Sequence, residues 1–337
     1  MNKLTGIAGA VAVAAAWGAA GAAGAAEFDL KMSSMFPSTH FVQKLALEPW
    51  AEEIAEKSDG RIEITFYSAG SALGDATKQF DQVRAGVVDF AVGIPAIPRG
   101  RHPRSVLIEL PFTVPDSEVG TCAITAMADE LQPDFPDTHI LSLTVTQPSG
   151  AHTKTKVDSL DGLKGMRIRT PTPAITAMLE EIGATPVGMP PTEIYESVER
   201  GVIDGNIMPW GPVGAFKLWE VLHYHIDAGI NPVAMYTLMN QRRYDSLPDD
   251  LKKVVDDASA KVFSNWGRWW KETDQEAIDA AKANGNEIIP MSDEERETWR
   301  ERLQPVIDNY LAENADMPAE DAHALYAKML EAVETCQ

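Results

Sequence analysis

The chain has 337 residues, with 29 Lys and Arg against 50 Asp and Glu and a formal net charge of −21. So acidic a protein is a poor partner for nucleic acid or an anionic membrane, and it can hold an anionic ligand only at a local positive site. The length is sufficient for two domains of ordinary size, each with its own core.

Residues 1–26 have the pattern of a secretory signal peptide. Lys3 precedes an apolar, alanine-rich run from Ile7 to Ala20, and the small residues Ala23-Gly24-Ala25 suit a signal peptidase. The run is short and interrupted by glycine, which disfavours the alternative of a membrane anchor. We expect this leader to be removed. The remaining sequence has no apolar stretch of membrane-spanning length, so we expect it to function outside the cytoplasm.

Two cysteines, Cys122 and Cys336, lie far apart in the sequence and form no CxxC motif. In an oxidising compartment they can pair in a single disulfide, and two buried free thiols are the alternative. The sequence leaves both open.

Strands and helices alternate along the first part of the chain. Strands are expected at residues 28–34, 61–66 and 87–94, and helices at 40–58 and 75–84. In the first helix, Leu45, Trp50, Ile54 and Ala55 should share one face. The alternation indicates an α/β fold with mostly parallel sheets.

The segment Asp249–Asn284 contains no proline and only one glycine, Gly267. Its apolar residues recur at helical spacing, and a single helix of this length would be ~54 Å long at ~1.5 Å per residue, enough to run over more than one lobe. Two helices broken near Gly267 are the alternative. Residues 294–314 and 319–334 are expected to form C-terminal helices.

Catalytic motifs are missing from the sequence. It contains no GxSxG, HExxH, P-loop or GxGxxG pattern, so we expect a binding protein without a cofactor and not an enzyme. His223 and His225 have no nearby cysteine or third histidine to complete a metal site, and we expect them in a partly exposed strand or loop.

The stretch Leu160–Pro171 contains two arginines, Arg167 and Arg169, that are the best candidates in the sequence for binding an anion. It predicts a tight turn and a short strand that ends at Arg169, and Thr172-Pro173 then begins a helix. An arginine at the carboxyl end of a strand, beside a helix N-terminus, lies where α/β proteins bind anions, and its guanidinium can hold a carboxylate through two hydrogen bonds. Arg167 would point to the same face, so the pattern does not choose between the two arginines, and an ordinary surface ion pair is the alternative.

Two other segments are candidates for a binding cleft. The basic loop at residues 99–104 is assigned at most a minor role at its rim. Trp210 ends the segment Asp204–Trp210, where it can wall a pocket and stack on a flat ligand or lie in the core under a loop.

At these residues the chain resembles the extracytoplasmic solute-binding subunits of TRAP (tripartite ATP-independent periplasmic) transporters. The combination of matching segments is specific, although no single motif is. They occur in family order across almost the whole chain after the leader: Gly60–Ile64, Ala85–Phe90, Glu109–Phe112, Leu163–Pro171, Gly183–Val187, Glu193–Tyr195, Gly201–Gly205 and Met239–Pro248.

The resemblance implies a periplasmic binding protein-like fold of two α/β lobes, joined by crossing strands and a long helix that spans both. We expect lobe I to comprise residues 27–146 and 233–275, and lobe II to comprise residues 147–232 and 276–337. The resemblance also implies a location in the periplasm. The implied partners are a small and a large integral membrane subunit driven by an ion gradient. We expect the binding protein itself to be a monomer.

The resemblance further implies that Arg169, and not Arg167, binds the ligand carboxylate. Members that bind sialic acid carry another arginine in the preceding strand, where residues 147–152 hold none, and many members place Asn where this chain has Met208. The expected pocket is therefore less polar. Together with Trp210 and Phe36, this favours a monocarboxylate with an apolar or aromatic body.

The carboxyl ends of strands converge on a cleft of this kind, so its walls should come from both lobes. The expected wall residues are Phe36, His40, Ile94, Pro95, Met208, Trp210 and Tyr236. Ligand should shift an open population toward a closed one through its extra contacts in the closed state. The rival functions are a receptor for an ATP-driven importer or a sensor, and a periplasmic enzyme.

Overall fold

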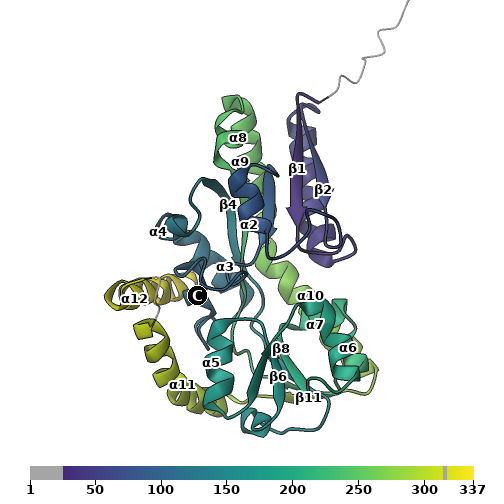
Figure 1. The fold of residues 1–337 in the computed structure, drawn as a ribbon, viewed down its shortest axis with the longest axis vertical. Coiled ribbons are helices and arrows are strands. Elements are labelled where there is room, and N and C mark those ends of the chain that lie inside the picture. Colours follow the sequence, from purple (N-terminus) through teal and green to yellow (C-terminus); the bar gives the residue numbers. More distant parts are fainter. Residues whose placement is uncertain (1–25, 314–316) are drawn as a thin grey trace, which may run out of the picture.

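The computed structural model describes residues 26–313 and 317–337, so the expected signal peptide falls outside the described residues, Ala26 excepted. The chain forms two sheets with helices packed on both faces of each, which is the two-lobed α/β architecture (Figure 1). None of the described helices is long and apolar enough to cross a membrane.

The first sheet, which we call the sheet of lobe I, has five strands in the order β2 (Ile62–Tyr67), β1 (Phe28–Ser34), β3 (Phe90–Gly93), β10 (Ala234–Asn240) and β4 (Thr138–Val145). Only β10 runs antiparallel to its neighbours. Helices α1 (Glu48–Lys57) and α9 (Asp249–Phe263) cover one face, and α2 (Gln79–Ala85) and α3 (Ser117–Ala126) cover the other. Two short helices, α4 (Ala128–Leu131) and α8 (Gln241–Asp245), complete this lobe.

The second sheet, that of lobe II, has six strands in the order β11 (Glu287–Pro290), β9 (Tyr224–Asp227), β5 (Gly150–Thr153), β8 (Gly205–Met208), β6 (Arg167–Thr170) and β7 (Thr185–Gly188). Here β5 alone runs antiparallel to its neighbours. Helices α5 (Pro173–Glu181) and α11 (Asp293–Glu313) pack on one face, and α6 (Ile194–Glu199), α7 (Trp210–Ala215) and α10 (Trp266–Ala283) pack on the other.

The chain crosses between the two sheets in two adjacent extended segments, residues 146–149 and 228–233. Their main chains bond to each other: Ser149 N donates to Asn231 O at 2.7 Å, and Thr146 N donates to Val233 O at 3.0 Å. The third connection is the α9–α10 pair, which runs from lobe I to lobe II (Figure 1). The crossing segments therefore join the lobes side by side as a hydrogen-bonded pair.

Residues 249–284 form two helices with a break at Ser264 and Asn265, which is the alternative to a single long helix. The close approach of α3 gives a physical reason for glycine at this place. A Cβ on Gly267 would lie 2.6 Å from Glu118 Cα and 2.7 Å from Ser117 O. The Ser117 hydroxyl also donates to Gly267 O at 2.6 Å. The N-terminus of α3 thus packs directly on the backbone that follows the break.

The first expected helix begins with a π-helical stretch, Gln43–Leu47, that continues into α1. Trp50 and Ile54 are fully buried as expected, but the prediction for Leu45 is wrong, because 41% of this residue is exposed. A π-helical turn contains more residues than an α-helical turn, so it rotates the side chains before α1 relative to the face that an α-helical pattern predicts.

The C-terminal helix α12 (Ala319–Cys336) packs on lobe I, which differs from the expectation that residues 276–337 belong to lobe II. Its apolar face contacts α3 of lobe I through Leu325, Met329 and Val333. Cys336 forms a disulfide with Cys122 of α3, which resolves the choice that the sequence left open. Helix α11 packs on α5 of lobe II, so the C-terminal helices return the chain from lobe II to lobe I.

Candidate functional site

The candidate site lies at the carboxyl ends of β6, β7 and β8, which are parallel and therefore end at the same edge of the lobe II sheet. This edge faces lobe I. A cavity of about 290 Å³ is lined by Thr170–Pro173 and Gly188 on one side and by Ala96 and Arg99 of lobe I on the other. Thr172 caps α5 by accepting from Ile175 N at 3.4 Å, as its sequence predicts.

Arg169 is the penultimate residue of β6 and is almost completely buried, with 5% of its surface exposed. Its Nε donates to Met189 O at 3.2 Å, and its Nη1 lies 3.5 Å from Ile207 O. No acceptor among the described residues bonds its Nη2. Main-chain carbonyls from both neighbouring strands or their loops thus hold the guanidinium in place.

The charge of Arg169 has no counter-ion within the described part of the chain. Burial lowers the pKa of its guanidinium to about 10, and no carboxylate raises it again. The side chain therefore remains protonated at neutral pH. A buried cation without an anion is costly, which makes this position a candidate anion site.

Arg167, two residues earlier, has a different environment. It is exposed and holds Asp204 in a two-pronged pair, with Nη2 to Oδ1 at 2.7 Å and Nε to Oδ2 at 3.0 Å. This pair raises the pKa of Arg167 and lowers that of Asp204. The ordinary surface ion pair that the sequence allowed for these two arginines is therefore found at Arg167.

A row of buried polar side chains extends from Arg169 across the sheet. Strand register places Asn206 of β8 beside Arg169, His152 of β5 beside Asn206, and His225 of β9 beside His152. Neighbours in register project from the same face of a sheet. Neither the oxygen nor the nitrogen of the Asn206 amide has a partner among the described residues. Asn206 is not predictable as a site residue from local sequence, because only strand pairing brings it to Arg169.

The two histidines form a hydrogen-bonded pair with fixed tautomers. His152 Nε2 donates to Met208 O at 2.9 Å, so the neutral ring must accept at Nδ1 from Nδ1 of His225, at 2.8 Å. Nε2 of His225 then accepts from the amide nitrogen of Asn286 at 2.7 Å. Burial lowers the pKa of His152 to about 3 and that of His225 to about 4. The expectation of a partly exposed His225 is therefore wrong, since its tertiary partner His152 buries it.

Phe36 and His40 of lobe I are buried and stacked, with ring centroids 4.5 Å apart. His40 Nδ1 accepts from Val42 N at 3.2 Å, so the neutral ring carries its proton on Nε2. The His40 ring also lies 6.5 Å from that of Phe216, directly after α7. The loop after β1 therefore meets lobe II next to the helix that follows β8.

The other expected wall residues differ in their surroundings. Ile94 and Pro95 follow β3, and Pro95 O accepts from His102 Nδ1 at 3.0 Å. Met208 and Trp210 share the apolar cluster under α6 and α7.

Trp210 packs edge-on against His152 at 4.8 Å, and its Nε1 lies 3.4 Å from Asp227 Oδ1. Tyr236 lies in the core of lobe I beside Phe135, with its hydroxyl unpaired among the described residues. The structure thus brings Arg169, Asn206 and Met208 to one face of the lobe II sheet, and it buries Trp210 and Tyr236 in apolar clusters.

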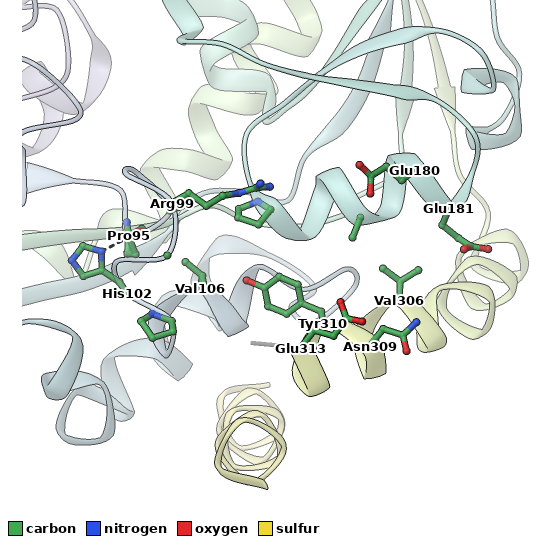
Figure 2. Close-up of a pocket in the computed structure, with 15 residues that line it drawn as sticks. Pro95, Arg99, His102, Val106, Glu180, Glu181, Val306, Asn309, Tyr310 and Glu313 are labelled. Atoms are coloured by element: carbon green, nitrogen blue, oxygen red, sulfur yellow. Dashed lines mark hydrogen bonds between the residues drawn. The ribbon is translucent and has the colours of Figure 1, made fainter. Parts of the chain in front are cut away.

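A larger cavity of about 640 Å³ lies beside this edge, between the basic loop and helices α5 and α11. Figure 2 shows Arg99 reaching from the loop toward α5, with Tyr310 of α11 below it and Glu180 and Glu181 on α5. Arg101 of the same loop pairs with Asp81, His102 is buried, and Arg104 lines a separate cavity together with Asp134. Arg99 is thus the arginine of this loop that faces lobe II.

No group of three His, Cys, Asp or Glu side chains within residues 26–313 and 317–337 is arranged to hold a metal ion. The polar groups at the edge of the lobe II sheet include the Arg169 guanidinium, the Asn206 amide, the Thr170 and Thr172 hydroxyls and main-chain atoms, which are binding groups. The arrangement can hold an anion and orient its uncharged part.

Comparison with known proteins agrees with this geometry. Residues 32–314 match the family model of bacterial extracellular solute-binding protein, family 7. One similar structure is a TRAP solute-binding protein from a marine metagenome, which is specific for aromatic acid ligands and was solved with metahydroxyphenylacetate. It is 30% identical to this chain with a TM-score of 0.85, and the match covers 91% of this chain and 99% of that one.

A TRAP solute-binding protein from Rhodoferax ferrireducens, solved with copurified benzoate, is also 30% identical, with a TM-score of 0.84 and coverage of 91% and 98%. The ectoine/5-hydroxyectoine-binding periplasmic protein of Ruegeria pomeroyi is 24% identical over 91% of this chain and 93% of its own length. The chain therefore belongs to the family 7 extracellular solute-binding proteins of TRAP transporters, which are binding proteins and not enzymes.

Proposed function

We propose that this protein captures a small aromatic or apolar monocarboxylate in the periplasm and delivers it to the two membrane subunits of a TRAP transporter. The observation that carries the proposal is the buried guanidinium of Arg169, which has no anionic partner in the described chain. A ligand carboxylate supplies the missing charge, and the planar guanidinium can hold it in two parallel hydrogen bonds.

Arg169 is the buried cation of this sheet edge, and one buried cation favours one carboxylate. Arg167 is neutralised by Asp204, and Arg99 lines the cavity from lobe I, opposite Thr170–Pro173. Met208 is apolar and two residues beyond Asn206 on the same strand, so it points to the same face as Arg169. The two relatives that are 30% identical were solved with metahydroxyphenylacetate and benzoate, which supports an aromatic acid as the ligand.

Capture involves closure of the lobes around the ligand. The charged group belongs to lobe II, whereas Phe36, His40, Ile94 and Pro95 belong to lobe I, so a ligand touches both sides only when the lobes approach. The membrane subunits would then recognise the closed form. A receptor for an ATP-driven importer or a sensor is the alternative, and membership of family 7 does not favour it.

Calorimetric titration of the mature protein with benzoate and related monocarboxylates tests the proposal, with a thermal-shift screen of organic acids to find the best ligand. Arg169→Ala should weaken binding by roughly 3–5 kcal/mol, because it leaves a buried carboxylate without its cation. Arg167→Ala is the matched control on the same strand and should bind like the wild type, since its charge is already paired. Equal affinity in wild type and Arg169→Ala would refute the assignment of Arg169.

A further inference from the structure

Asn206 is a buried amide with no hydrogen-bonding partner in the described chain. It is fully enclosed on β8, and both Oδ1 and Nδ2 lack a partner. Its neighbour His152 cannot supply one, because the two ring nitrogens of His152 already bond Met208 O and His225. Buried side-chain amides are nearly always bonded, so a partner from outside the chain is expected.

A single partner that satisfies both atoms of the amide must be able to donate and to accept. The amide oxygen of Asn206 requires a donor and its nitrogen requires an acceptor. A carboxylate can only accept, but a hydroxyl group does both. A ligand hydroxyl or a water molecule meets this requirement, and a simple aromatic carboxylate such as benzoate does not.

The position of Asn206 connects that partner to the ligand of Arg169. The two residues are paired in register across β6 and β8 and therefore project side by side from one face of the sheet. The Nη2 group of Arg169 is also without a partner in the described chain. A carboxylate on Arg169 and a hydroxyl on Asn206 can therefore belong to one small molecule.

We infer that Asn206 determines ligand specificity and selects hydroxylated monocarboxylates over their unsubstituted counterparts. This inference rests on the proposed function, because it assumes that Arg169 holds the carboxylate. A site built to bond a hydroxyl discriminates against the analogue that lacks it, since the buried amide is then left unpaired. Main-chain carbonyls fix the side chains of Arg169 and His152, which flank Asn206 on the sheet. The Asn206 amide is therefore the side chain of these three that can still orient toward a ligand hydroxyl.

The test compares benzoate with its 2-, 3- and 4-hydroxy derivatives by calorimetry, in wild type and in Asn206→Leu, which has a similar volume and no polar atoms. At least one hydroxylated acid should bind the wild type about tenfold or more tightly than benzoate. Asn206→Leu should lose this preference, so that benzoate and its hydroxylated derivatives bind the variant with similar affinity. Asn206→Ala, which leaves room for water, serves as a second variant in case the leucine disturbs folding.

Asn206→Asp provides an independent readout. An aspartate beside Arg169 would pair with the guanidinium inside the protein, so all the aromatic acids should lose binding together. The inference is overturned if the hydroxyl preference persists in Asn206→Leu, or if the wild type binds benzoate and its hydroxylated derivatives equally, in which case water is the partner of Asn206. Failure of the wild type to bind any monocarboxylate would instead overturn the proposed function and, with it, this inference.

Discussion

Several ionisable side chains are buried in their neutral form, and their pKa values predict how stability depends on pH. Four histidines have lowered pKa values because burial disfavours the charged ring: His40, His102, His152 and His225. The unfolded chain protonates these rings near pH 6.5, whereas the folded chain resists protonation down to about pH 4 or below. Their contribution to stability is therefore lost as the pH falls below about 6.5.

Buried carboxyl groups act in the opposite direction. Burial raises the pKa of Glu109 and of Asp274 to about 8, although Ala234 N donates to the first and the N-terminus of α7 donates to the second. Folding stabilises their protonated forms, so this contribution is present at low pH and is lost as the pH rises toward 8. Above pH 6.5 these four histidines are neutral in both the folded and the unfolded chain. In that range the buried carboxyl groups therefore determine how the free energy of unfolding changes with pH.

We therefore expect the free energy of unfolding to be greatest near pH 6.5 and to fall between pH 6.5 and 8. The two sets oppose each other between pH 4.5 and 6.5, so the rise in the free energy of unfolding there should be smaller than the histidines alone would produce. Urea unfolding at a series of pH values measures the profile. Glu109→Gln removes one titrating group and should flatten the fall above pH 6.5, and a wild-type profile that is flat or rising in that range would disprove the assignment.

At the scale of elements, the packing of α3 on α10 depends on a single glycine. Replacing Gly with Ala inside an exposed helix stabilises it by about 0.5–1 kcal/mol. At Gly267 the new methyl group would lie 2.6–2.7 Å from main-chain atoms of α3, which must move apart. Overpacking of this kind costs typically 1–3 kcal/mol, so the clash exceeds the helical gain.

Gly267→Ala should accordingly destabilise the protein by roughly 1–2 kcal/mol in urea unfolding. Gly188→Ala is the control, because its backbone does not lie in the left-handed region and its added methyl group would have no heavy atom within 4 Å. Its stability should match that of the wild type. If both variants unfold like the wild type, α3 and α10 do not pack as tightly as the structure describes.

At the scale of the whole molecule, the connections between the lobes allow a hinge motion. The crossing segments are hydrogen-bonded to each other, and the α9–α10 pair is broken at Ser264 and Asn265. Helix α12 is fixed to α3 of lobe I by the disulfide, whereas α11 packs on α5 of lobe II. We expect the crossing segments and the α9–α10 break to act as the hinge.

We expect ligand to shift this hinge toward a closed form and to reduce the radius of gyration in small-angle scattering. Moving a population from 1:99 to 99:1 requires ~5.5 kcal/mol of differential affinity, which a paired carboxylate and an apolar body covered from lobe I can supply together. Arg169→Ala at the same ligand concentration is the control and should remain open. An unchanged radius of gyration, with binding confirmed in the same sample, would contradict closure.

The local pattern of the sequence was sufficient to predict most elements and the candidate cation. Periodicity and capping predict β1, β2, the start of α5 and the two C-terminal helices close to their observed positions, because amphipathic spacing and caps act within a few residues. The same reasoning selected Arg169 at the end of a strand, and the family resemblance then separated it from Arg167.

Only the tertiary structure decided which residues surround that cation. Asn206 lies beside Arg169 because β6 pairs with β8, and His225 is buried because β9 pairs with β5 and brings it to His152. The break before Gly267 and the docking of α12 on lobe I likewise depend on α3, which is more than 100 residues earlier in the chain. A sequence pattern records the face of each element, whereas the pairing of distant elements determines what that face touches.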